Sequence, residues 1–298
     1  MPSFRSAKSQ AQYAVSQRVA LGQSRHANKE DGQIHSVRTA QAYSQALSGF
    51  TQFIQEHNLG GLKDANPEIA QAYLSERQET GLSQSTLDRD RQAIQCHLQQ
   101  TLDRVAALEK TDLATRSYTP EQIREIADNQ NVRNALATEI AYSAGLRGHE
   151  LQTLQRADER AASTHREWSC DRFAGRNGER YTVRGKGGLI REVQIPRDLA
   201  ESLEATRFVG GPKDITDRGV NYKQQYDIGA GKNWATSFSR VSQNQLGWSN
   251  GAHGVRHTYA QERMGELQRE GFNYKKALGT VAQELGHFSP HTTEAYLR

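Results

Sequence analysis

The sequence is poor in cysteine and in long apolar stretches. Its 298 residues include only two cysteines, Cys96 and Cys170, which cannot build a disulfide framework and so indicate a reducing compartment. No apolar run approaches the roughly 18 to 20 residues that a membrane-spanning helix needs, and the N-terminus lacks the apolar core of a secretory signal. We therefore expect a cytoplasmic protein that makes no use of a membrane.

Apolar residues are also scarce overall. They make up 35% of the chain, and the mean hydropathy of -0.82 is low for a compact enzyme. The aromatic and aliphatic residues still suffice for modest cores. The length exceeds that of one typical domain, so we expect two.

Acidic residues are missing from the beginning of the chain. No Asp or Glu precedes Glu30, while this Ser-, Gln- and Ala-rich stretch carries Arg5, Lys8, Arg18, Arg25 and Lys29. With an isoelectric point near 9.0, this favours a polyanionic partner, because counterion release rewards a basic surface. Residues 1–35 are therefore predicted to form a basic N-terminal arm, either lying on phosphates or remaining a solvated, partly disordered tail.

Residues 36–112 have the pattern of a small helical domain. Apolar residues recur at helical spacing from Tyr43 to Ile54, with Ser36 available as N-cap. A second helix is predicted to begin at Pro67, after Asn66 as its cap. A third, from Ser83, carries an apolar stripe that we expect to continue to Leu102.

Residues 117–298 mix helical and strand patterns. Thr119, Pro120 and Gln122 predict a helix start with a capping box, and Gly145 interrupts the next helix. The alternating segments on both sides of Gly185–Gly188 predict a hairpin with Lys186 at its tip. The stretch "YKQQYDIGAGKNWATSFSR" is interpreted as loop and short helix, and helix is expected again near His253.

Two histidines four residues apart, His253 and His257, raise the question of a metal site. A helical zinc site needs a Glu beside the first His and a third ligand, and the sequence offers neither. His253 and Arg256 are three apart, so on a helix they share one face. An imidazole beside a forked cation suits a phosphate or a carboxylate.

Six residues of this second domain form an ordered set, within "AGLRGHEL", "RGKGG", "HGVRH", "ELGH" and "HTTEAYLR". They are Arg147, Lys186, His253, Arg256, His287 and Tyr296. Their order and contexts resemble the tyrosine recombinase family, the phage-integrase type of DNA strand-exchange enzyme. Each motif is weak alone, but five in this order are specific. The resemblance implies a mainly α fold with a small β-sheet or hairpin: a helical, SAM-like core-binding domain followed by an α+β catalytic domain.

The resemblance also implies a role for each residue. Arg147 and Arg256 would clamp the scissile phosphate, and Glu150 would orient Arg147. His253 would serve as base, and His287 would donate to a phosphate oxygen. Lys186 would protonate the leaving 5′-oxygen, and Tyr296 would become linked to the 3′-phosphate. In the helical domain, Arg89, Arg91 and Arg104 are candidate DNA contacts.

Elementary chemistry supports the same assignment. Attack on a phosphodiester builds negative charge on the non-bridging oxygens, which two arginines and two histidines can stabilise without magnesium. A tyrosine nucleophile conserves the phosphodiester energy in a covalent ester, so strands can be rejoined without ATP. We expect no cofactor and no metal.

The predicted function is that of a site-specific DNA recombinase or integrase of a mobile genetic element. It would act on double-stranded DNA as a homotetramer on two DNA sites, associated with the nucleoid, with possible accessory DNA-bending or directionality proteins. Two alternatives stay open: DNA relaxation like that of a type IB topoisomerase, and DNA binding by a catalytically silent relative. Only Leu297 and Arg298 follow Tyr296, whereas family members generally carry a further segment that docks on a neighbouring protomer. We expect either an early end or assembly through other contacts.

Overall fold

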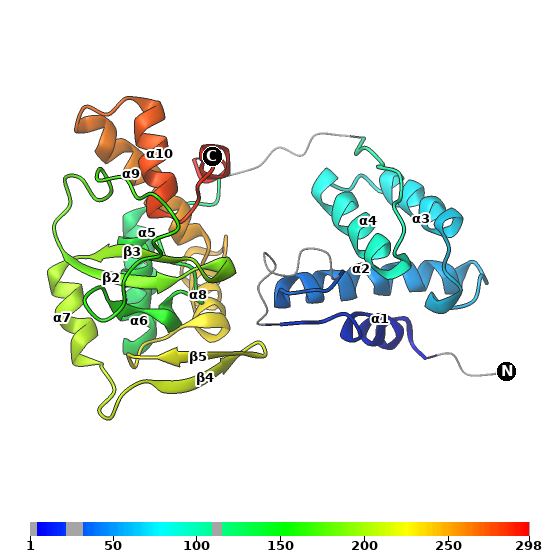
Figure 1. Cartoon of the computed structure of the whole chain (residues 1–298), viewed down its shortest axis with the longest axis horizontal. Coiled ribbons are helices and arrows are strands. Elements are labelled where there is room, and N and C mark those ends of the chain that lie inside the picture. Colours follow the sequence, from blue (N-terminus) through cyan, green and yellow to red (C-terminus); the bar gives the residue numbers. More distant parts are fainter. Residues whose placement is uncertain (1–4, 22–31, 109–114, 298) are drawn as a thin grey trace. The chain divides into compact units, whose positions relative to one another are not determined.

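The computed structural model describes residues 5–21, 32–108 and 115–297, apart from the side chain of Lys186. The chain divides into two compact units, Met1–Asp112 and Leu113–Arg298, each with a core of its own (Figure 1). Among the described residues, no helix is long and apolar enough to cross a membrane.

The first unit is helical. Its elements are α1 (Ala7–Ser16), α2 (Val37–Glu56), the 3-10 turn η1 (Leu62–Asp64), α3 (Pro67–Glu79) and α4 (Gln84–Leu98). Ser36 and Asn66 accept hydrogen bonds from the backbones of Thr39 and Ile69, as expected of N-caps. The long α2 packs against α1 and α4 (Figure 1), and its Phe50 and Ile54 are fully buried in the core of this unit.

The first helix differs from the prediction of a separate basic arm. Ala11 and Val15, four residues apart on one face of α1, are buried in the same core as α2. The Gln10 side chain accepts a hydrogen bond from the Leu62 backbone at 2.9 Å, which ties α1 to η1. These apolar contacts make α1 part of the helical unit. Arg25 and Lys29 of the predicted arm lie outside the described residues.

The second unit combines helices with two small antiparallel sheets. Its helices are α5 (Pro120–Asp128), α6 (Val132–Ala144), α7 (Arg197–Ala205), α8 (Gly231–Leu246), α9 (Gly254–Arg269), α10 (Tyr274–Glu284) and α11 (Pro290–Glu294), with 3-10 turns η2 (Leu151–Thr153) and η3 (Lys186–Gly188). The strands are β1 (Gln155–Arg156), β2 (Glu179–Arg184), β3 (Ile190–Ile195), β4 (Lys213–Asp217) and β5 (Val220–Gln224). The sheet orders are β1-β2-β3 and β4-β5.

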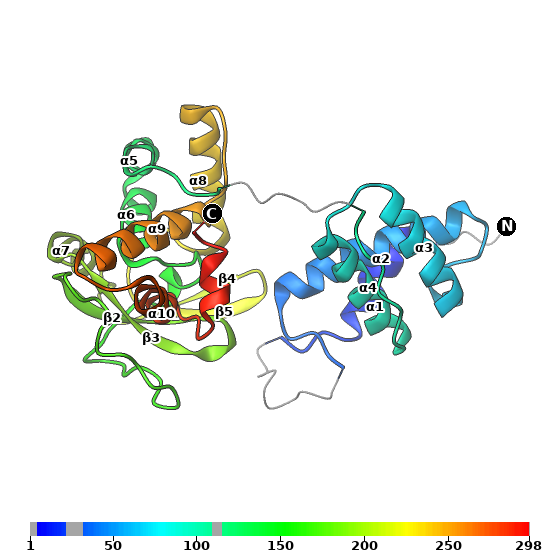
Figure 2. The ribbon, with the colours of Figure 1, turned by 90° about the horizontal axis from the view of Figure 1, so that it is seen from above.

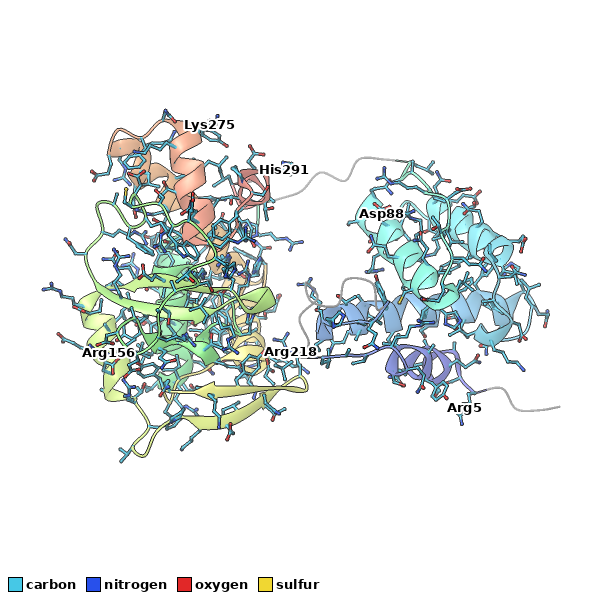
Figure 3. The ribbon with its side chains drawn as sticks, viewed as in Figure 1. Arg5, Asp88, Arg156, Arg218, Lys275 and His291 are labelled. Atoms are coloured by element: carbon cyan, nitrogen blue, oxygen red, sulfur yellow. The ribbon has the colours of Figure 1, made fainter. Side chains whose placement is uncertain are left out.

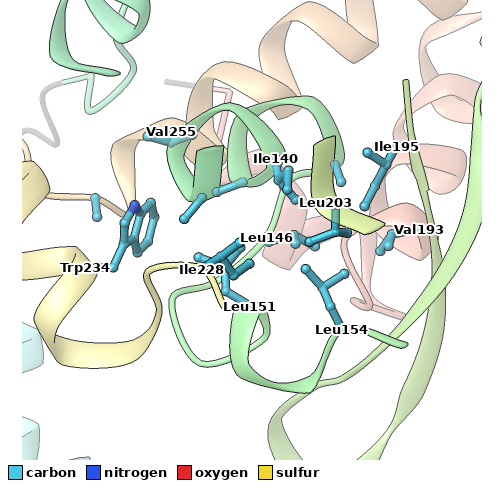
Figure 4. Packing of buried hydrophobic residues seen from close by; sticks show 14 of the residues in the cluster. Ile140, Leu146, Leu151, Leu154, Val193, Ile195, Leu203, Ile228, Trp234 and Val255 are labelled. Carbon is cyan, nitrogen blue, oxygen red and sulfur yellow. The ribbon is translucent and has the colours of Figure 1, made fainter. Parts of the chain in front are cut away.

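The core of this unit fixes the segments that carry the functional side chains. Figure 4 shows Leu146 and Leu151, on either side of the turn after α6, packed with Val193 of β3 and Val255 of α9. Helix α10 packs against α9 and contacts β3, and Figure 2 shows α10 beside β3 when the unit is viewed from above. One apolar cluster thus holds the turn after α6, the β2–β3 hairpin and the start of α9 together.

Two predictions were wrong, one about this unit and one about the first. The stretch interpreted as loop and short helix overlaps the end of β5 and the first part of the 16-residue helix α8. The backbone of Lys232, at the start of α8, donates a hydrogen bond to Asp217 of β4. Because this capping side chain is distant in sequence, the residues next to α8 give no sign of a helix start. Arg218 lies in the turn of the exposed β4–β5 hairpin (Figure 3). In the first unit, α4 ends at Leu98 because Gln99 adopts a left-handed conformation, and buried Leu102 lies beyond the helix.

Candidate functional site

The turn after α6 presents Arg147. Gly145 ends the helix with φ of 60°, as its predicted interruption implies, and a Cβ there would lie 2.7 Å from Cδ1 of Tyr259. The Arg147 backbone then donates to Oε2 of Glu150 at 2.8 Å, and its Nη1 donates to Oε1 at 2.9 Å. One carboxylate therefore fixes both the backbone and the guanidinium of Arg147.

Glu150 is fully buried and serves more than one arginine. Besides Arg147, it accepts a hydrogen bond from Nη2 of Arg191 at 2.9 Å, and Nη1 of Arg256 lies 3.8 Å away. Burial alone would raise the pKa of this carboxyl, but the three guanidinium groups hold the pKa far below its ordinary value. Glu150 is thus the counter-charge of a buried cluster of cations.

Arg256 lies at the start of α9 and is fully buried. It donates to the backbone carbonyls of Gly145 and Leu285, which come from the turn after α6 and from the end of α10. Burial and the charge of Arg147 lower the pKa of Arg256 to about 9, so it remains a cation at neutral pH. Its contacts fasten together the two segments that carry Arg147 and His287.

His287 follows α10 and bridges the two arginines. Its Nε2 lies 2.9 Å from Nη2 of Arg147 and 3.2 Å from Nη2 of Arg256. Its Nδ1 lies 3.3 Å from the Thr293 hydroxyl. Burial, followed by the charges of Arg256 and Arg147, lowers the pKa of His287 to about 3, so the imidazole is neutral.

Tyr296 lies beside Arg256 and three histidines. Its hydroxyl lies 3.2 Å from Nε2 of His253, the N-cap residue of α9. Its ring centroid is 4.6 Å from that of His257 and 5.1 Å from that of His287, and the Arg256 guanidinium lies 5.6 Å from it. Five of the six predicted catalytic side chains therefore form one connected group with Glu150.

Lys186, the sixth, has a side chain outside the described residues. Its backbone begins η3, between the two strands of the predicted hairpin. Gly187 and Gly188 follow with φ of 77° and 84°, values that disfavour other residues. The register from Glu179↔Ile195 to Arg184↔Ile190 is continuous up to this turn.

The three arginines predicted to contact DNA hold local partners in the first unit. Arg89 donates to buried Asp90, Arg104 donates to Asp88, and Arg91 donates to the Leu102 carbonyl. Arg104 has the most exposed side chain of the three, at 61%. Their contact with DNA stays a prediction.

Arg191 and His257 belong to the site and were not predicted for it. Arg191 is buried on the same face of β3 as Val193 and Ile195, and it donates to Glu150 and to the Glu284 carbonyl. An arginine at a buried position of an alternating strand was the available signal. His257, interpreted as a supporting residue of its helix, is buried with its ring against Tyr296.

The arrangement has the chemistry of an anion site beside a nucleophile. Two guanidinium groups converge on one imidazole nitrogen, and a phenol lies next to them within reach of a second imidazole. Preorganised donors of this kind stabilise an oxyanion in a buried setting more than they would in water.

Comparisons with known proteins agree with this picture. Residues 32–104 match the family described as phage integrase, N-terminal SAM-like domain. The chain is 24% identical over 285 residues to tyrosine recombinase XerC of Bacillus pumilus (strain SAFR-032), covering 88% of this chain and 86% of that protein.

Two solved structures are similar in fold. The XerH site-specific recombinase, in a post-cleavage complex with palindromic difH substrate, has a TM-score of 0.55 and 18% identity, covering 98% of this chain and 90% of that one. A lambda integrase dimer bound to a COC′ core site has a TM-score of 0.52 and 15% identity, covering 98% and 76%. The chain is thus similar to a tyrosine recombinase over most of its length, its first unit matches the N-terminal SAM-like domain of phage integrases, and its fold is that of the tyrosine recombinase structures.

Proposed function

We propose that this protein is a site-specific DNA recombinase that cleaves and rejoins double-stranded DNA through Tyr296. The observation that carries the proposal is the single network joining Arg147, Arg256 and His287 beside the Tyr296 phenol. A silent relative would not need a phenol next to two converging guanidinium groups and within reach of an imidazole.

In this proposal the two arginines and His287 bind the non-bridging oxygens of the scissile phosphate. The phenolic oxygen of Tyr296 attacks phosphorus, and its proton passes to Nε2 of His253, which lies 3.2 Å from the hydroxyl. The bond from phosphorus to the 5′-oxygen breaks, and Lys186 supplies a proton to that oxygen. Rejoining reverses each step, so the phosphodiester energy is kept.

The partners follow from this chemistry as further parts of the proposal. The substrate is double-stranded DNA, with recombination between two sites by four protomers. A role in integration or excision of a mobile element fits a chain similar to tyrosine recombinases, and accessory DNA-bending proteins remain an expectation. Arg89, Arg91 and Arg104 are proposed DNA contacts of the first unit. A protein working on such DNA acts at the nucleoid.

A covalent trapping experiment tests the proposal. DNA linked to the protein in cells is recovered and sequenced, and a nicked duplex of that sequence then serves as a suicide substrate. We expect a covalent adduct with the wild-type chain and none with Tyr296→Phe, while DNA binding is retained. Tyr274→Phe is the matched control, because Tyr274 is an exposed tyrosine of α10. An adduct that persisted in Tyr296→Phe would place the nucleophile elsewhere.

Recombination and relaxation are separated by a second assay. A plasmid carrying two copies of the recovered site should give recombinant products that require both copies. If a plasmid with one copy is relaxed and a plasmid with two copies gives no recombinants, the topoisomerase alternative is supported.

For Lys186→Ala, a substrate with a better 5′ leaving group should restore cleavage, because the general acid is then unnecessary. Without restoration, the proton comes from another residue.

A further inference from the structure

The hydrogen bonds of His287 fix its protonation in the DNA-free protein. Arginine side chains only donate hydrogen bonds, so Nε2, which faces Arg147 at 2.9 Å and Arg256 at 3.2 Å, must accept from both. A neutral imidazole carries one proton, and that proton is therefore on Nδ1.

The Thr293 hydroxyl accepts a hydrogen bond from this Nδ1–H group. The hydroxyl lies 3.3 Å from Nδ1 of His287, and Thr293 is fully buried on α11. Its carbonyl also accepts a hydrogen bond from the Tyr296 backbone at 2.9 Å. Thr293 thus touches both the imidazole and the segment that carries the phenol.

The proposed reaction needs the opposite arrangement at Nε2. To bind a phosphate oxygen, His287 must donate from Nε2, the atom that accepts from the arginines when no phosphate is present. A hydroxyl can accept from Nδ1–H or donate to a bare Nδ1. Carbonyl and carboxylate oxygens can only accept, so a hydroxyl is the partner that permits both states.

The charged surroundings decide which state is present. Arg147 faces His287 from the turn after α6, Arg256 from α9 and Arg191 from β3, and Glu150 is the nearby carboxylate. Tyr296 and, beyond it, His253 and His257 are further titratable groups near the ring. A bound phosphate would satisfy the arginines with its own oxygens and so release Nε2 from their hydrogen bonds.

We infer that Thr293 is a positioning residue that lets His287 change from hydrogen-bond acceptor in the empty site to donor in the phosphate-loaded site. The change moves one proton from Nδ1 to Nε2 through water and leaves the charge of the ring unaltered. The Thr293 hydroxyl correspondingly turns from acceptor to donor. The first part of this inference, His287 as acceptor in the empty site, follows from the hydrogen bonds above. The second part, His287 as donor to a bound phosphate, rests on the proposed function.

Nitrogen-15 NMR of the full-length, DNA-free protein tests the first part. The wild type should show His287 with a protonated Nδ1 and a bare Nε2. Thr293→Ser, which keeps the hydroxyl, should leave the Nδ1–H resonance as in the wild type. Thr293→Val, which keeps the shape, should retain the tautomer that the arginines impose but shift the Nδ1–H resonance, because the hydrogen bond to the hydroxyl is lost. Thr292→Val is the matched control, since Thr292 is the exposed neighbour on the same helix. A wild-type protein with its proton on Nε2 would overturn the inference without any variant.

Cleavage of the nicked duplex recovered from the trapped adduct tests the second part. Thr293→Val should slow single-turnover cleavage by about tenfold, the loss expected for one hydrogen bond worth about 1.4 kcal/mol, while DNA affinity is unchanged. Thr293→Ser should cleave at nearly the wild-type rate. Equal rates for Thr293→Val and Thr292→Val would overturn the role. If the wild type forms no adduct but the Nδ1–H resonance depends on Thr293, the proposed function fails and the empty-site hydrogen bond stands.

Discussion

At the scale of single residues, one carboxylate sets the charge balance of the site. Glu150 is fully buried and faces the guanidinium groups of Arg147, Arg191 and Arg256. Glu150→Gln keeps the shape but removes the charge, which leaves buried cations uncompensated. We expect the free energy of unfolding to fall by about 3 to 5 kcal/mol, as in other broken buried ion pairs. Tryptophan fluorescence in urea measures it, because Trp168, Trp234 and Trp248 all lie in the second unit.

An exposed ion pair provides the control for this substitution. Glu121 pairs with Arg124 at 2.9 Å on the surface of α5, with both side chains more than half exposed. Glu121→Gln should leave the urea unfolding transition close to that of the wild type, since exposed pairs contribute little. Equal effects of the two substitutions would contradict the role given to Glu150.

The residues of the site differ in how far the sequence reveals them. Arg147, His287 and Tyr296 stand in short motifs whose order carries the prediction, and the structure brings these side chains into one network. Arg191 was missed because an arginine in a strand is ordinarily taken for an exposed residue. Only its register on β3, which depends on the fold, puts it beside Glu150.

At the scale of elements, the end of α6 positions the arginines. Gly145→Ala would put a Cβ at a φ of 60° and 2.7 Å from Tyr259, so both strain and overlap oppose it. We expect a loss of at least about 2 kcal/mol in urea unfolding followed by tryptophan fluorescence. Gly265→Ala, in the middle of α9 with open space at its Cβ, should instead stabilise by roughly 0.5 to 1 kcal/mol. A Gly145→Ala protein as stable as the wild type would contradict this account of the turn.

Elements with local signals were predictable from the sequence, and elements without them were not. The capping box at Thr119 and the hairpin around Gly185–Gly188 are confirmed, because side chains within a few residues determine them. The prediction for the α8 segment was wrong because the start of this helix is capped by Asp217, a residue distant in sequence. The β4–β5 hairpin is largely exposed, and β4 carries a single apolar residue, Ile215, which is too few for the alternation that marks a half-buried strand.

At the scale of the whole molecule, the site makes stability depend on pH. The folded-state pKa of His287 is lowered from 6.5 to about 3, so the unfolded chain binds more protons between these values. Its contribution is fully present above about pH 6.5 and is lost as pH falls toward 3. The Glu150 pKa is also lowered, so its contribution is lost below about pH 4.5.

Removing the imidazole should flatten this dependence. Between pH 6 and 4.5, where Glu150 contributes little slope, His287→Gln should lower the pH dependence of the unfolding free energy by up to about 1.4 kcal/mol per pH unit. Urea unfolding at several pH values provides the comparison, and His291→Gln serves as control because His291 is exposed. A slope unchanged by His287→Gln would show that the buried imidazole is not held neutral.

In the proposed reaction, one atom of the molecule, the phenolic oxygen of Tyr296, becomes bonded to DNA. Proteolytic digestion of the wild-type adduct, followed by tandem mass spectrometry, identifies the modified residue and the end of DNA attached to it. We expect Tyr296 to carry a nucleotide through its 3′-phosphate. A nucleotide on any other residue, or one joined through a 5′-phosphate, would contradict the proposed reaction.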